Sequence, residues 1–296
     1  MRRILAVLAA LILIGAAGLF ALTRPATVPE AAIAAITPDL ARGEAVFHAA
    51  GCASCHAADG AEGEARLILS GGHSFATPAG TFVAPNISQD PEHGIGAWSK
   101  ADIVTAVMKG TSPDGRHYFP AFPYAAYAKA ELSDIVSLAA YLKTLPADPT
   151  PSQPHDLAFP YSIRMGVGAW KLLGVSEGFA VDLPDDPQIR RGQYLAEALA
   201  HCGECHTPRT ATQALDTARW FAGAPNPSGK GSIPNISPAK LSWSAADIAA
   251  YLKSGFTPEF DAAGGSMRDV ITSLANLPDE DLAAIAAYLK AVPPAE

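Results

Sequence analysis

Hydrophobic and polar positions divide the chain into one long apolar run and two similar helical halves. The run extends without a polar residue from Ile4 to Leu22 and follows Arg2 and Arg3. A helix needs about 20 apolar residues to cross a bilayer, and flanking cations stay on the cytoplasmic side. A cleaved signal peptide is the alternative, but it would have a shorter apolar core and a small-residue cleavage site. We therefore predict a transmembrane signal-anchor over residues 1–24.

Helix start and stop signals recur at matching places after an Ala- and Pro-rich tether at 24–36. Thr37, followed by Pro38, is predicted to cap one helix, and Asp186, followed by Pro187, is predicted to cap another. Further along each half, a capping box precedes an apolar-periodic segment that ends at a glycine; the boxes are Ser99 with Asp102 and Ser244 with Asp247, and the glycines are Gly110 and Gly255. The two halves therefore start and stop their helices in the same order.

Sequence blocks repeat between the halves. Four pairs of blocks share their order and lie 145 to 150 residues apart; they start at 52 and 202, 85 and 234, 98 and 243, and 139 and 286. Two unrelated helical bundles would not reproduce this order, so we infer a tandem duplication. The expected division is a first unit at 37–146, a linker at 147–185 and a second unit at 186–296.

The linker breaks the helical pattern with prolines at positions 146, 149, 151 and 154. Its later part, 161–175, is apolar and includes Met165 and Trp170. A short helix packed across the interface between the units is the favoured interpretation. An exposed docking surface is the alternative.

All four cysteines belong to two C-x-x-C-H motifs, which occupy 52–56 and 202–206. This motif is typical of c-type haem attachment, in which two thiols bond the haem and the following histidine binds the iron. Zinc would require further Cys or His ligands at short spacing, and a redox thiol pair would require a βαβ pattern. We therefore predict two covalently attached haem c groups, attached at Cys52, Cys55, Cys202 and Cys205, with His56 and His206 as proximal ligands.

The amino-acid composition restricts the kinds of partner that the protein could bind. The formal net charge of −8 argues against nucleic acid and fits docking onto a basic protein surface. The 25 prolines and 25 glycines suit small helical domains whose long loops cover a cofactor.

The motifs together resemble those of a known family. They read C-A-S-C-H at 52–56, P-N-I-S-Q-D-P-E-H-G-I-G-A-W-S at 85–99, G-R-H-Y-F-P-A-F-P-Y at 115–124 and H-C-G-E-C-H-T-P-R at 201–209. In these respects the chain is similar to the membrane-anchored dihaem cytochromes c that serve bacterial alcohol and gluconate dehydrogenases. Such subunits often carry a third haem domain, and this chain has no third C-x-x-C-H motif.

The resemblance implies an all-α fold of two tandem class I cytochrome c domains behind the transmembrane helix. It also implies electron transfer at the periplasmic side of the bacterial inner membrane. Electrons would come from a dehydrogenase, quinol or another cytochrome and go to an oxidase or a soluble carrier. The alternatives are a dihaem enzyme, such as a peroxidase or a sulfur-compound oxidase, and a gas-binding haem sensor.

The sixth iron ligand distinguishes the two units. Met267, on a glycine-rich loop before the last helix, is the candidate for the second haem, although it could instead fill a gap in the core. The corresponding residue of the first unit is Phe122, which cannot bind iron, so the first haem either takes another ligand or has an open position. His117 is then the nearest candidate for the first haem, and Met165 is a weaker one; the alternative for His117 is a surface or propionate contact.

Several repeated residues are predicted to support the haems. The carbonyls of Pro85 and Pro234 should accept the second ring N–H of each proximal histidine. Asn86 and Asn235 are expected to bond haem propionates, and Arg42 and Arg191 to offset propionate charge. Trp98 and Trp243 are expected to pack on the haem edge, with plain core packing as an equal alternative.

Overall fold

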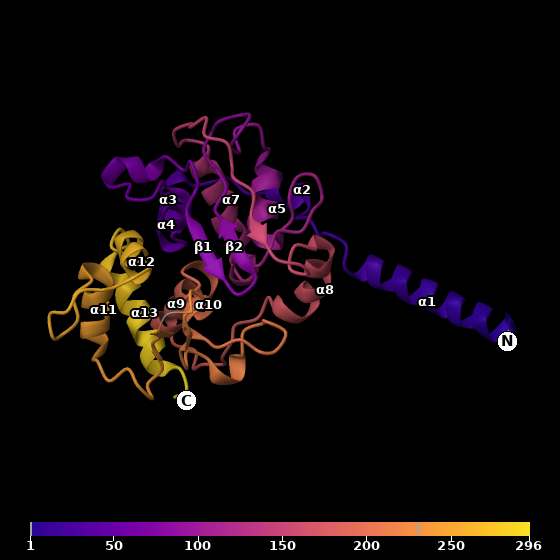
Figure 1. The fold of residues 1–296 in the computed structure, drawn as a ribbon. Helices are drawn as coiled ribbons and strands as arrows, with labels where there is room; N and C mark the ends of the chain where they lie inside the picture. Colours follow the sequence, from indigo (N-terminus) through magenta and orange to yellow (C-terminus); the bar gives the residue numbers. More distant parts are fainter. Residues whose placement is uncertain (1, 230) are drawn as a thin grey trace.

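A computed structural model describes residues 2–229 and 231–296 and is mostly helical (Figure 1). Its α-helices are α1 (Arg2–Leu22), α2 (Glu30–Ala34), α3 (Leu40–Ala49), α4 (Cys52–His56), α5 (Lys100–Lys109), α6 (Tyr124–Tyr127), α7 (Leu132–Leu142), α8 (Arg164–Gly174), α9 (Pro187–Gln193), α10 (Gly203–His206), α11 (Ala245–Ser254), α12 (Met267–Leu274) and α13 (Asp279–Ala291). Its other helical turns are η1 (Gly63–Leu67), η2 (Tyr194–Leu199) and η3 (Thr217–Arg219).

Short strands accompany the helices. An antiparallel sheet has the order β1 (Ser74–Thr77), β2 (Gly80–Val83) and β3 (Asp156–Leu157), and a second ribbon pairs β4 (Ala224–Pro225) with β5 (Ser232–Ile233). These strands lie in the connections between helices. The helical class predicted from the sequence is confirmed, and β3 ties the linker to the first unit.

Helix α1 extends away from the globular part (Figure 1). None of its residues is buried, and its mean hydropathy is 2.8 over an 18-residue window. By length and composition α1 can cross a membrane, although a signal sequence meets the same criteria. The predicted apolar run thus forms a continuous helix.

The helix caps largely follow the sequence signals. Both predicted capping boxes form, and Gly110 and Gly255 take the left-handed conformation, with φ of 58° and 79°. Asp186 caps α9 as expected. The predicted Thr37 cap is wrong: Asp39 caps α3, because its carboxylate accepts the N–H groups of Ala41 and Arg42.

Each unit is built around one close helix crossing. Helix α3 packs on α7 in the first unit, and α9 packs on α13 in the second. A Cβ atom on Gly43 would lie 2.2 Å from the Ser137 carbonyl oxygen, and one on Gly192 would lie 1.8 Å from that of Ala284. Only glycine permits these approaches, so the two copies share the same crossing.

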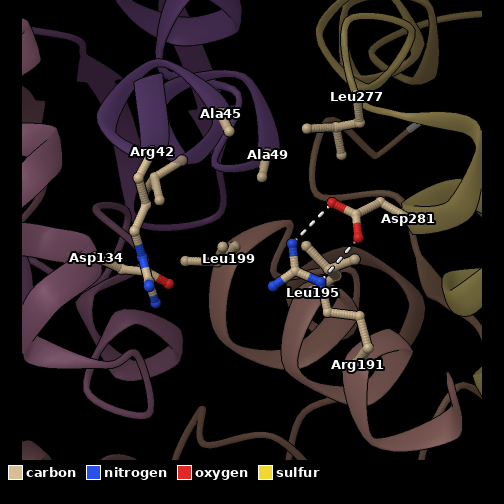
Figure 2. Close-up of a pocket in the computed structure, with 10 residues that line it drawn as sticks. Arg42, Ala45, Ala49, Asp134, Arg191, Leu195, Leu199, Leu277 and Asp281 are labelled. Carbon is tan, nitrogen blue, oxygen red and sulfur yellow. Dashed lines mark hydrogen bonds and ion pairs between the residues drawn. The ribbon is translucent and has the colours of Figure 1, made fainter. Parts of the chain in front are cut away.

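The two units pack directly against each other. Helix α12 of the second unit contacts α3 and α4, and η2 contacts α6 and α3. Buried apolar side chains of both units form one continuous cluster. A cavity of about 250 Å³ lies at this interface, lined from both units by residues that include Val46, Ala49, Leu195 and Leu277 (Figure 2).

The linker helix α8 packs on the first unit. Lys171 Nζ donates hydrogen bonds to the carbonyls of Lys109 and Gly110 at 2.6 and 2.8 Å, and Trp170 meets Tyr124 edge to face. The favoured prediction of a helix across the interface between the units is therefore wrong. The amine of Lys171 holds α8 at the C-terminal end of α5, where a cation is favoured by the helix dipole and by the last carbonyls.

Candidate haem sites

The first C-x-x-C-H motif forms the single helical turn α4. Gly51 precedes it with φ of 61°, a left-handed turn that lets the chain leave α3 and start α4 at once. Cys52 and Cys55 are free thiols. Burial raises the pKa of Cys52 to about 12, and burial followed by the nearby Cys205 raises the pKa of Cys55 to about 11. Two thiols therefore lie on one helical turn, where both can bond to one haem.

The second motif repeats this turn, with Cys202 as the N-terminal cap of α10. A Cβ on Gly203 would lie 2.1 Å from Cη2 of Trp220, so the indole covers the space between the two cysteines. Trp220 Nε1 donates to the hydroxyl of buried Tyr288 at 2.8 Å, which fixes the indole. The corresponding position of the first motif is Ala53.

Both proximal histidines are oriented in the same way. His56 Nδ1 donates to the Pro85 carbonyl and His206 Nδ1 to the Pro234 carbonyl, each at 2.8 Å, which confirms the predicted partners. Burial lowers the pKa of both imidazoles below their ordinary value, so both are neutral at pH 7. The fixed tautomer leaves Nε2 as the nitrogen for iron. Two thiols and an oriented neutral imidazole are a donor set that fits haem c.

Phe122 and Met267 occupy corresponding places before α6 and at the start of α12. Both are half-buried against the core. The Phe122 ring lies among the rings of Tyr118, Tyr124 and Tyr127, with centroids 5.9, 6.2 and 6.0 Å away. An aromatic cluster thus fills the first unit where the second offers a thioether. Iron ligation by Met267 stays a prediction.

His117 is buried at the end of α1. Its Nε2 donates to the Thr23 carbonyl at 2.8 Å, and burial lowers its pKa. Its Nδ1 has no hydrogen-bond partner within residues 2–229 and 231–296, so Nδ1 is the nitrogen left for a ligand. Binding of His117 to the first iron stays a prediction. Met165, the weaker candidate, is 71% exposed on α8, which argues against it.

The repeated asparagines bond to backbone. Asn86 Nδ2 donates to the carbonyls of Asp148 and Thr150, and Asn235 Nδ2 donates to that of Ala295, each within 2.8 Å. These bonds tie the segment behind each proximal histidine to the chain that follows the last helix of the same unit. A propionate contact by either asparagine stays a prediction.

The repeated tryptophans lie half-buried at the core of their units. Trp243 meets Tyr251 edge to face at 5.2 Å, and Trp98 packs against the buried cluster. Their role at a haem edge stays a prediction.

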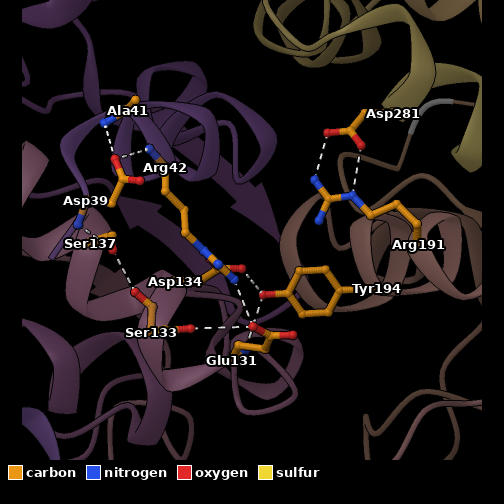
Figure 3. Close-up of polar contacts among 10 residues, drawn as sticks. All are labelled: Asp39, Ala41, Arg42, Glu131, Ser133, Asp134, Ser137, Arg191, Tyr194 and Asp281. Carbon is orange, nitrogen blue, oxygen red and sulfur yellow. Dashed lines mark hydrogen bonds and ion pairs between the residues drawn. The ribbon is translucent and has the colours of Figure 1, made fainter. Parts of the chain in front are cut away.

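The repeated arginines form ion pairs with the last helix of their own unit. Arg42 pairs with Asp134 and with Glu131, and Arg191 forms two bonds to Asp281 at 2.8 and 2.7 Å (Figure 3). These bonds hold the first helix of each unit on its last helix. Compensation of propionate charge by Arg42 or Arg191 stays a prediction.

Sequence reasoning missed the residues that join the two sites. Ser54, inside the first motif, donates to the Asp269 carbonyl at 3.0 Å and lies 3.0 Å from the Ser273 hydroxyl. His201, just before the second motif, lies against the ring of Tyr127 with centroids 5.8 Å apart. No sequence signal marks these contacts, because they join segments far apart in the chain.

These contacts have a reciprocal pattern. The attachment turn of the first unit touches α12, which begins at Met267, and the segment before the second attachment turn touches α6, which follows Phe122. The two haem-binding segments are therefore neighbours across the interface. The fold and the sites define a helical protein with two adjacent c-type haem centres.

The cytochrome c family model matches residues 40–146 and 189–293, so the chain belongs to the cytochrome c family. A diheme cytochrome c-type protein of Cereibacter sphaeroides is 55% identical over 297 residues and is covered completely, as is this chain. The fructose dehydrogenase cytochrome subunit of Gluconobacter japonicus is 39% identical over 86% of this chain and 53% of that subunit. The cytochrome c subunit of the quinone-type alcohol dehydrogenase of Gluconobacter oxydans is 35% identical, over 85% and 54% respectively.

The chain spans about half the length of these two dehydrogenase subunits. Two matched cytochrome c regions and two C-x-x-C-H motifs show that it carries two covalently bound c-type haems. Its general role is that of an electron-transfer cytochrome.

Proposed function

We propose that this cytochrome relays electrons at the periplasmic face of the bacterial inner membrane. It accepts electrons from a dehydrogenase or from quinol and passes them to a terminal acceptor, an oxidase or a soluble cytochrome. The observation that carries the proposal is the reciprocal packing of the two haem-binding segments, in which Ser54 bonds to α12 and His201 lies against Tyr127. Adjacent centres suit transfer through the molecule from one partner to another.

The location is supported by α1 and the arginines before it. Arg2 and Arg3 stay in the cytoplasm under the positive-inside rule, so residues from about 25 onward lie on the outer side. The dehydrogenase partner is supported by relatives named as cytochrome subunits of fructose, alcohol and gluconate dehydrogenases.

The protein's own residues prepare each centre for electron transfer. A haem group supplies a one-electron couple when bound. Burial keeps His56 and His206 neutral, and the Pro85 and Pro234 carbonyls orient them, so that neither imidazole has to turn when an electron arrives or leaves. Asn86 and Asn235 fasten the segments that bear these carbonyls.

The test uses membranes from a strain that lacks this gene, supplied with purified full-length holoprotein in liposomes. Ethanol, gluconate, fructose and a short-chain quinol are added separately, while haem reduction and oxygen uptake are followed. We expect at least one donor to reduce both haems and to restore oxygen uptake only when the holoprotein is present. Failure of every donor to reduce either haem would overturn the proposal.

The presence of phenylalanine at position 122 supports a second candidate function. Because a phenylalanine ring cannot bind iron, the first haem would have an exchangeable position if His117 does not fill it. The protein would then act as a peroxidase, oxidise a small sulfur compound or bind a gas. A high-spin ferric spectrum supports this alternative, and turnover with peroxide or thiosulfate separates an enzyme from a sensor. A low-spin spectrum for both haems excludes it.

A further inference from the structure

The linker helix α8 presents apolar side chains outward. Met165, Leu172 and Leu173 are 71%, 55% and 66% exposed. Their spacing of seven and eight residues places them on one face of the helix. The segment just before α8 adds Phe159, at 81%, and Tyr161, at 54%. We call these five residues the α8 patch.

The charged residues of α8 point away from the α8 patch and toward the first unit. Arg164 donates to the His117 carbonyl at 3.0 Å and lies over the Phe119 ring at 4.5 Å, and Lys171 donates to two carbonyls at the end of α5. A helix on a water-facing surface normally turns its charges outward and its apolar face inward. The orientation of α8 is reversed, so its outer face is suited to an apolar environment.

The α8 patch lies beside the end of the apolar helix α1. A Cβ on Gly168 would lie 2.6 Å from the Thr23 carbonyl oxygen, so the two backbones are in close contact. Leu22 and Leu172 line the same cavity of about 390 Å³. Figure 1 shows α8 at the side of the globular part from which α1 extends. The apolar surface of α1 thus continues onto α8.

We propose that the α8 patch is a second membrane contact, in which α8 lies in the lipid interface next to the end of α1. This inference rests on the anchor proposed above. Lipid is the occupant that fits, because the patch is continuous with the end of a helix able to span the bilayer and includes the aromatic residues Phe159 and Tyr161. The contact would fix the orientation of the first unit relative to the membrane. With a net charge of −8, the protein would make this contact through apolar burial and not through attraction to anionic lipid.

The test places a nitroxide label at single introduced cysteines in the full-length holoprotein, reconstituted in phosphatidylcholine vesicles. Leu173→Cys reports on the α8 patch. Ile12→Cys reports on α1. Phe260→Cys is the solvent-exposed reference, because the side chain of Phe260 in the second unit is 86% exposed. Collision of each label with oxygen, which concentrates in lipid, is compared with collision with a water-soluble nickel chelate. Unchanged haem spectra confirm that each variant is folded.

We expect the label at 173 to collide with oxygen and with the nickel chelate at rates similar to those of the label at 12. Its collision with the nickel chelate should be several-fold lower than that of the label at 260, at both low and high salt. A water-like label at 173 beside a lipid-like label at 12 would overturn the α8 contact and leave the anchor intact. Water-like labels at both positions would overturn the anchor as well. A label at 173 that becomes protected only after addition of dehydrogenase-containing membranes would assign the patch to a protein partner and reject lipid.

Discussion

At the scale of single residues, the two copies differ at the position held by Phe122 in the first unit and by Met267 in the second. Phe122 lies in an aromatic cluster with Tyr118 and Tyr127, whereas Met267 offers a sulfur at the start of α12. The backbone around both is similar: Thr111 bridges to His117 before Phe122, and Phe256 bridges to Ala262 before Met267. The two corresponding positions therefore share a similar backbone and differ in side chain, with a phenyl ring in the first unit and a thioether in the second.

We expect Phe122→Met to move the first haem towards His/Met ligation, because methionine carries its thioether at the same position in the second unit. The weak absorption of thioether-bound ferric haem at long wavelength should then roughly double relative to the parent protein. Met267→Ala in the parent should abolish that absorption and serves as the matched control. An unchanged spectrum in Phe122→Met would refute the correspondence of the two positions.

Replacement of His117 tests the ligand of the first haem in the parent protein. We expect His117→Ala to turn the first haem high-spin, because the buried Nδ1 is lost. His117→Gln is the control for the structural bond, since an amide N–H can still donate to the Thr23 carbonyl. A first haem that is low-spin in the parent and high-spin in both variants supports ligation, whereas a first haem already high-spin in the parent and unchanged in both shows that the site was open. A low-spin first haem in both would show that another residue binds the iron.

At the scale of elements, the glycine at each helix crossing sets how closely the first and last helices of a unit approach. Gly43 and Gly192 face the carbonyl oxygens of Ser137 and Ala284. The adjacent arginine ion pairs, Arg42 with Asp134 and Arg191 with Asp281, reinforce both crossings. The Arg191–Asp281 pair is partly exposed and contributes little by itself. Asp134 is buried, so its pairing with Arg42 stabilises the first crossing together with the close packing of the helices.

Gly192→Ala should separate α9 from α13, because the added Cβ would lie within 1.8 Å of the Ala284 oxygen. Overpacking of this kind typically lowers the free energy of unfolding by about 2 kcal/mol. Denaturant unfolding of the holoprotein in detergent, followed by circular dichroism, measures the change. Gly166→Ala is the control: its Cβ would meet no atom within 4 Å, so stability should stay the same or rise. Equal stability of the Gly192→Ala variant and the parent would contradict this account.

At the scale of the whole molecule, the two haem-binding segments lie together at the interface while α1 extends from the first unit alone (Figure 1). His117, the candidate ligand of the first haem, is thus linked to the proposed anchor through the Thr23 carbonyl. The second attachment motif lies in the unit that begins at α9. In the relay proposed above, the first unit would therefore lie nearer the membrane than the second.

If His117 binds the first iron, a redox titration of the holoprotein should resolve two midpoints, with the higher one belonging to the second haem. Methionine ligation raises the potential of a haem relative to histidine ligation, so electrons would run downhill from the first unit to the second. Met267→Ala should lower only the higher midpoint. Two equal midpoints in the parent, or no change in the variant, would reject this direction of flow.

The apolar helix α1 should remain in the mature protein as an anchor. We expect the cytochrome to sediment with membranes, to resist extraction by salt and to require detergent for release. N-terminal sequencing measures the same property directly. A mature chain that begins beyond residue 20 would identify the segment as a cleaved signal and would contradict the anchor.

The sequence by itself determined the features that are encoded locally. The apolar run at 4–22, the two attachment motifs, the capping boxes at Ser99 and Ser244 and the repeat all depend on residues close together in the chain. Even the proline carbonyl behind each proximal histidine could be predicted, because a proline segment facing the proximal histidine is common in the cytochrome c fold that the chain resembles. The cap of α3 was misplaced by two residues, since Thr37 and Asp39 are both good caps and only the folded backbone selects between them.

Only the tertiary structure decided which distant surfaces meet. The hydrogen bond from Ser54 to α12 and the contact of His201 with Tyr127 join the two units. The outward apolar face of α8 also depended on the fold, because an amphipathic pattern does not say which face will be covered. Lys171 could bond the carbonyls at the end of α5 only by turning inward, and this orientation left Leu172 and Leu173 outside, beside the end of α1.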